Sequence, residues 1–248
     1  MKLTRKKAEE LLNNGVHWKK MPDAKIKHSI AVATAAKKIA QRCNLDGKHA
    51  YVLGLIHDIG CHYGSDQHPL EGYIYMKYLG YDDEYADICL THSFLEGDPN
   101  CTAEGLLVEG NNVRPNRIVP YQNEPDKKFV LDFLKNHNYT PYEKIINLCD
   151  LMCSDKIVGL DARMADLTSR KGVFSTTERH IATAKKLQEE LERQMGCTMD
   201  DLFGKEIAKN LASGDTYFVE QKQGKNIVPV EKSQEKDDSS DEEEAENS

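Results

Sequence analysis

The sequence predicts an all-α protein, a bundle of about seven to nine helices, and three observations support this fold class. Apolar residues recur at the three- and four-residue spacing of a helix through most of the chain. Residues that favour helix starts, such as Asp, Thr and Pro, precede these segments, and glycines follow several of them. The alternation of apolar and polar residues that marks a strand is scarce.

The first three predicted helices lie in the N-terminal quarter of the chain. Thr4 can cap a short helix that ends near Gly15. Asp23 begins a longer helix whose apolar residues have helical spacing. Asp46 caps a third helix, which runs through Leu53 and Leu55 into the segment Ile-His-Asp-Ile-Gly at 56–60.

Two shorter helices are predicted to follow, and then an irregular stretch. Pro69 suits the first turn of a fourth helix, which Gly80 would end. Asp83 starts a fifth helix that carries His92. Residues 95–125 break the pattern with repeated Gly, Pro and Asn, and a stretch of this length is typical of a lid or of disorder.

Helical spacing returns at Asp126 and continues through the C-terminal half. Residues 140–143, Thr-Pro-Tyr-Glu, predict a capping box with proline at the first helical position, and the helix that they start carries Asp150. Residues 175–178, Ser-Thr-Thr-Glu, predict a second capping box before a long helix that ends near Gly196.

Charge and composition divide the 248 residues into parts. The net charge of −8 comes almost entirely from residues 231–248, which hold nine acidic side chains and two lysines. The rest is nearly neutral, so no nucleic-acid surface is expected. We expect an N-terminal helix and linker at 1–22, the main domain at 23–213 with 95–125 as an irregular insertion or lid, and a disordered acidic tail at 214–248.

Two further features bear on location. No apolar run approaches the ~20 residues that span a bilayer, and residues 1–7 lack the apolar core of a secretory signal. The seven cysteines are odd in number and show no CxxC spacing, which favours free thiols in a reducing compartment. We therefore expect a cytoplasmic protein with no membrane partner, and the oligomeric state stays open.

Four polar side chains fall on the apolar faces of four predicted helices: His28, His57, His92 and Asp150. Burying such groups without partners is costly, and one shared cation would satisfy all of them. Imidazole nitrogen and carboxylate oxygen suit borderline or hard divalent metals. The alternative is that each of these groups has a backbone partner of its own. The pattern therefore predicts a metal site, with separate buried polar groups as the other interpretation.

His57 and Asp58 are neighbours, and adjacent residues of a helix point ~100° apart. Both side chains can reach one ion only if the helix ends there. Gly60 is expected to provide that ending as a C-terminal glycine.

These residues resemble the motif of the HD superfamily of metal-dependent phosphohydrolases. The resemblance rests on His28, on the segment from Leu55 to Gly60, and on the segment from Lys144 to Asp150. It extends from about residue 25 to residue 205. The chain is most similar to small stand-alone bacterial HD proteins, and more distantly to bacterial symmetrical dinucleoside-tetraphosphate hydrolases. The fold implied is the HD-domain helical bundle.

The resemblance also implies a set of metal ligands. The ligands of the first ion would be His28, His57, Asp58 and Asp150, and Asp58 would bridge to a second ion where one is present. His68 and His92 are candidate ligands of that second ion. His92 could instead pack on a helix face or contact substrate, and His68 could lie beside a helix start without a ligand role.

The chain departs from the family pattern at a position that would help to bind substrate. Many relatives have a lysine after His-Asp-Ile-Gly that would help to hold phosphate, whereas this chain has Cys61 and His62. That role is therefore lost or taken by His62. The other cationic candidates are Lys156 and Arg163, with a solvated helix face as the alternative.

The activity implied is hydrolysis at phosphorus by a phosphomonoesterase or phosphodiesterase acting on a nucleotide or similar small phosphorylated molecule. A divalent ion would generate the nucleophile from water and polarise the phosphoryl oxygen, so His57 and Asp58 would be catalytic. One or two ions of Fe, Mn, Co, Ni or Mg fit this ligand chemistry. A non-catalytic regulatory module that binds a nucleotide and a purely structural helical bundle are the alternatives.

Overall fold

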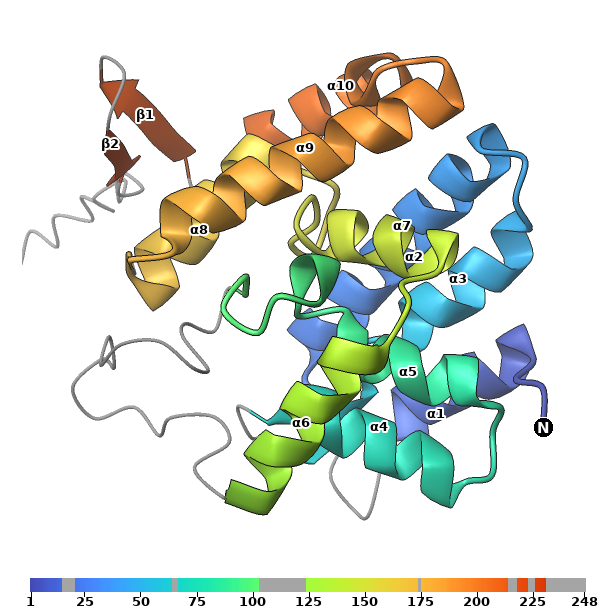
Figure 1. Ribbon diagram of the computed structural model, residues 1–248. Coiled ribbons are helices and arrows are strands. Elements are labelled where there is room, and N and C mark those ends of the chain that lie inside the picture. The colour runs from blue at the N-terminus through green and yellow to red at the C-terminus, as the bar shows by residue number, and fades with distance from the viewer. Residues whose placement is uncertain are drawn as a thin grey trace, which may run out of the picture.

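A computed structural model describes residues 1–14, 21–63, 67–102, 124–173, 175–213, 218–222 and 226–230. This part of the chain contains ten α-helices, two short 3-10 helices and one pair of strands (Figure 1). The α-helices are α1 (Arg5–Asn14), α2 (Asp23–Arg42), α3 (Gly47–Ile56), α4 (His68–Tyr78), α5 (Asp83–Thr91), α6 (Glu124–Asn136), α7 (Pro141–Asp150), α8 (Leu160–Lys171), α9 (Thr177–Met195) and α10 (Met199–Ala212). The predicted all-α bundle is confirmed, although with ten helices instead of seven to nine.

The helices α2, α3 and α7 form the centre of the bundle. The pair α2 and α3 packs closely along its length, α7 lies against both, and α9 crosses α2 and α7 (Figure 1). A Cβ on Gly54 of α3 would lie 2.5 Å from the Cα of Ala33 on α2, so glycine is needed for this approach. Because the two helices run in opposite directions, the contact also brings His28 of α2 towards His57, which follows α3.

Local capping interactions explain where several helices begin. Asp46 accepts hydrogen bonds from the backbone amides of Lys48 and His49 at the start of α3, as predicted. The capping box at residues 140–143 is present at the start of α7. The capping box predicted at 175–178 is wrong, because α9 has Thr176 as its N-cap and no side-chain bond caps it. A capping box that was not predicted, formed by Thr198 and Asp201, starts α10.

The chain leaves the helical path directly after α3, where His57 and Asp58 form a turn before the 3-10 helix η1 (Ile59–Tyr63). The helix therefore ends at the His-Asp pair, but the role predicted for Gly60 is wrong. Gly60 is not among the residues with positive φ. A Cβ on it would lie 1.9 Å from the carbonyl oxygen of His68 and 2.6 Å from the backbone nitrogen of Gly72. Gly60 thus allows α4 to pack against the turn that carries the pair.

The Gly60→Ala variant is expected to be destabilised by about 3 kcal/mol, because the three nearest atoms that the new methyl group meets all belong to the backbone. Urea unfolding measures the loss. Gly204→Ala is the matched control, since the Cβ there meets only the side chain of Asp200, which can move. That control should be neutral or stabilising by up to about 1 kcal/mol. Equal stability of the two variants would contradict the close approach at Gly60.

The segment predicted to be irregular, 95–125, is described only at its ends. The 3-10 helix η2 (Leu95–Gly97) begins it and α6 starts at Glu124, while residues 103–123 lie outside the described residues. Within 214–248, which was predicted to be disordered, the strands β1 (Phe218–Lys222) and β2 (Asn226–Val230) pair antiparallel beside α8. Residues 231–248 lie outside the description, so their disorder stays a prediction, as do the domain boundaries.

Two further observations concern the whole described chain. None of its helices combines the length and the apolar character that crossing a membrane requires. All seven cysteines are free thiols, and Cys89, Cys149 and Cys153 lie in the core.

Candidate metal centre

Five of the predicted ligands lie at or next to helix ends, and this placement brings them together. His57 and Asp58 follow α3, His92 directly follows α5, and His68 and Asp150 are terminal residues of α4 and α7. His28 is the exception, because it lies in the second turn of α2. Helix ends allow neighbouring side chains to diverge from the helical path, which the adjacent pair His57 and Asp58 requires.

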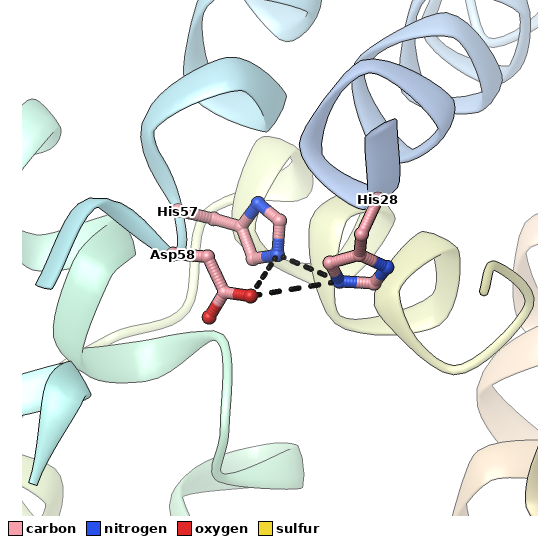
Figure 2. A group of neighbouring side chains, drawn as sticks. All are labelled: His28, His57 and Asp58. Carbon is pink, nitrogen blue, oxygen red and sulfur yellow. Dashed lines mark hydrogen bonds and ion pairs between the residues drawn. The ribbon is translucent and has the colours of Figure 1, made fainter. Parts of the chain in front are cut away.

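The first group of ligand atoms joins α2 to the turn after α3 (Figure 2). The Nε2 atoms of His28 and His57 lie 3.3 Å apart, and each lies 3.7 Å from Oδ2 of Asp58. The carboxylate of Asp150 adds a fourth atom, since its Oδ1 lies 2.9 Å from Nε2 of His28 and 3.8 Å from Nε2 of His57. Asp58 and Asp150 therefore each lie within 4 Å of both imidazole nitrogens of the first group.

The second group of ligand atoms surrounds Oδ1, the other carboxylate oxygen of Asp58. Oδ1 of Asp58 is 3.1 Å from Nε2 of His68 and 3.4 Å from Nε2 of His92, and the two imidazole nitrogens are 3.2 Å apart. Each group of three could hold a metal ion. Asp58 thus lies between two sets of ligand atoms, one facing each carboxylate oxygen.

Backbone carbonyl groups determine which ring nitrogens are available to a metal. The Nδ1 atom of His28 lies 2.9 Å from the carbonyl oxygen of Ser154. The Nδ1 atom of His57 lies 2.8 Å from the carbonyl oxygen of Gly54, and that of His92 lies 2.8 Å from the carbonyl oxygen of Cys89. Because a carbonyl only accepts, each Nδ1 must donate its N–H, which leaves Nε2 with a lone pair in the neutral ring. This second layer of hydrogen bonds is typical of histidines that ligate metals.

The donor set fits a bound cation. Two ligand atoms that each lie about 2.1 Å from one metal, with a right angle between the two bonds, are about 3 Å apart. The distances between ligand atoms within both groups are close to this value. Without a cation or added protons, the lone pairs of His28 and His57 would face each other and two carboxylates. In the second group one lone pair has a hydrogen-bond donor, because Ser93 Oγ lies 3.0 Å from Nε2 of His92 and can donate to it.

Burial and charge act in opposite directions on these groups. His57 and Asp58 are almost completely buried, at 0% and 2% exposure. Burial alone would raise the pKa of Asp58, but the charge of Lys25 and the neighbouring imidazoles outweigh it and hold the pKa well below its usual value. Burial lowers the pKa of His68 to about 4 despite its hydrogen bond to Asp58. Asp58 is therefore ionised and His68 neutral near pH 7.

The ligand groups open into a cavity of about 480 Å³, a size typical of small-molecule sites. Of the three predicted substrate-binding residues, only Arg163 lines it. His62 is buried on η1 and does not line this cavity, and Lys156 donates a hydrogen bond to Ser213 at 3.0 Å. A substrate-binding role for His62 and Lys156 stays a prediction.

The cavity is also lined by residues that were not predicted to belong to the site. Lys25 donates to Oδ2 of Asp58 at 2.7 Å, and its position one turn before His28 on α2 was a signal for this role. Asp166 and Arg170 of α8 and His180 of α9 also line the cavity. Nothing in the local sequence distinguishes these three from residues of a solvated helix face.

His180 should make the protein sensitive to acid. Burial lowers its pKa to about 4, against about 6.5 when unfolded, although Asp150 and Asp98 partly oppose the shift. As pH falls from 7.5 to 5, the unfolded chain takes up the proton first, so stability decreases. The expected loss is about 2 kcal/mol. Urea unfolding of the metal-free protein and of His180→Gln at both values measures it; an identical pH dependence in the two proteins would refute the expectation.

Comparison with protein-family models matches residues 26–153, a little over half of the chain, to the HD domain. The match includes both groups of ligand atoms and Asp150. Comparison with curated proteins and with solved structures gives no match. The cavity residues on α8 and α9 lie beyond the matched segment.

Proposed function

Because the chain belongs to the HD-domain family, a superfamily of metal-dependent phosphohydrolases, we propose that it hydrolyses a phosphate ester or anhydride of a nucleotide or similar small phosphorylated molecule. The observation that carries the proposal is the position of Asp58, which lines the cavity and whose two carboxylate oxygens face separate groups of histidine nitrogens. A purely structural bundle has no need for this arrangement, since it places costly polar groups in the core.

The chain's own residues have distinct parts in this reaction. A bound divalent ion would supply a nucleophile from water near neutral pH and polarise the phosphoryl oxygen. His28, His57, Asp58 and Asp150 would hold one ion, and Asp58 would share a second with His68 and His92. Lys25 would add a positive charge beside Asp58 for the phosphate that enters, in a chain whose His-Asp-Ile-Gly segment is followed by Cys61 and not by a lysine.

The experiment is metal analysis of the anaerobically purified protein, followed by a hydrolysis screen over nucleotides and chromogenic phosphate esters. We expect bound Fe, Mn, Co, Ni or Mg and turnover of at least one phosphorylated compound. Metal-free protein that also fails to bind any of these ions when they are added would overturn the proposal. Tight binding of a nucleotide that stays intact after hours with metal would support the regulatory alternative.

The number of ions is tested separately. His92→Ala should lower the bound metal from two ions per chain to one, because it removes a ligand of only the second group. His49→Gln is the matched control, since this histidine pairs with Glu84 on the surface and should change nothing. Inductively coupled plasma mass spectrometry measures both variants. A single ion in the unmodified protein, unaffected by His92→Ala, would show that the second group is not a metal site.

A further inference from the structure

The helices α8 and α9 contribute a cluster of polar residues to the cavity that the proposed reaction does not yet use: Arg163, Asp166, Arg170 and His180. This cluster, here called the arginine subsite, lies outside the segment that matches the HD domain. Its chemistry differs from that of the ligand groups. The arginine subsite is made mainly of positively charged guanidinium groups, whereas the ligand groups are made of imidazole and carboxylate groups.

Asp166 holds the two arginines in place. Arg170 donates from Nε to Oδ1 and from Nη2 to Oδ2, both at 2.7 Å, and Arg163 donates from Nη1 to Oδ2. Burial alone would raise the pKa of Asp166, but the hydrogen bond from Arg170 and the charge of Arg163 outweigh it and lower the pKa. The trio therefore carries one net positive charge, with both guanidinium groups oriented before any ligand binds.

One buried donor of the subsite has no hydrogen-bond partner within the described part of the chain. It is Nε of Arg163, whose side chain is only 12% exposed. His180 is 5% exposed and lines the same cavity. Leaving a buried donor unsatisfied is costly, so Nε of Arg163 points to a ligand that accepts hydrogen bonds.

We propose that the arginine subsite binds a second phosphate group of the substrate, so that the substrate carries two phosphoryl groups, one at the ligand groups and one at Arg163 and Arg170. This inference rests on the proposed function, because it concerns the same cavity. The planar guanidinium fork matches phosphate geometry. The neutral ring of His180 can donate an N–H to the same group without adding charge. The cavity volume of about 480 Å³ leaves room beyond a single phosphate.

The test compares two probes on the metal-loaded, full-length protein by calorimetry. Inorganic phosphate has one phosphoryl group, and methylenediphosphonate has two that cannot be hydrolysed apart. Arg163→Gln, Arg170→Gln and His180→Gln should each weaken binding of the diphosphonate about tenfold. Binding of phosphate should stay within about twofold of the unmodified protein, since phosphate occupies the ligand groups alone.

Arg179→Gln is the matched control, because this arginine is next to His180 in sequence but pairs with Asp98 and does not line the cavity. It should leave binding of both probes unchanged. Thermal unfolding verifies that each variant is folded. If Arg163→Gln fails to fold because it disturbs the buried Asp166, then Arg170→Gln and His180→Gln still decide the question.

The possible results separate the subsite from the reaction. Equal weakening of both probes would mean that the arginines hold the same phosphate as the ligand groups, and this would overturn the inference. Unchanged diphosphonate binding in all three variants would do the same. Selective loss of diphosphonate binding in a protein that hydrolyses nothing would support the subsite and count against the proposed function.

Discussion

The Asp58→Asn variant is expected to lose hydrolytic activity by about 10²–10⁴-fold. Its carboxylate is shared by both groups of ligand atoms, and an amide oxygen is a much weaker ligand without the charge. Charge stabilisation by a metal in the transition state is worth several kcal/mol, and each 1.36 kcal/mol is a factor of ten in rate. Steady-state hydrolysis of the best substrate from the screen, with metal analysis of the same sample, measures the effect.

The fold of this variant should survive, which separates a loss of chemistry from a loss of structure. Removing the charge of Asp58 leaves Lys25 without its partner, but the side chain of Lys25 is 41% exposed and can turn to solvent. Asp132→Asn on the exposed surface of α6 is the matched control and should keep full activity and metal content. Asp58→Asn protein that retains both ions and its rate would show that this carboxylate does not bridge two ions.

Removal of the bound metal should lower the melting temperature by about 8–16 °C. A ligand present at a thousand times its dissociation constant stabilises the fold by about 4 kcal/mol. For a domain of this size each kcal/mol shifts the melting temperature by about 2–4 °C. The physical cause is that the imidazole lone pairs and carboxylates of the centre face one another when no cation lies between them.

Differential scanning calorimetry with and without a chelator, at one pH, measures this shift. His28→Ala should show a smaller effect of the chelator on its melting temperature than the unmodified protein, because it removes a ligand of the first group and the hydrogen bond to Asp150 but leaves the second group intact. Lys38→Gln, which removes a surface ion pair with Glu206, should keep the full dependence on metal. An unmodified protein whose melting temperature is the same in chelator and in added metal would refute the expectation.

Much of the fold could be predicted because the signals are local. Helix starts at Asp46 and at residues 140–143 depend on residues within one turn, and apolar spacing within a helix depends only on its own sequence. The prediction of a capping box at 175–178 was wrong because the Ser-Thr-Thr-Glu segment offers two adjacent residues as the N-cap. The helix α9 uses the second of them, Thr176.

The sequence by itself determined that this is a helical protein, and it placed His28, His57, His92 and Asp150 on apolar helix faces, where polar residues need a common partner. Asp58 and His68 joined this set through the resemblance to the HD superfamily. Only the tertiary structure decided how Asp58 divides its oxygens between two groups, why residue 60 must be glycine, and that Lys25, Arg170 and His180 line the cavity while Lys156 does not. These features depend on contacts between helices far apart in the chain, and no pattern within a single helix specifies them.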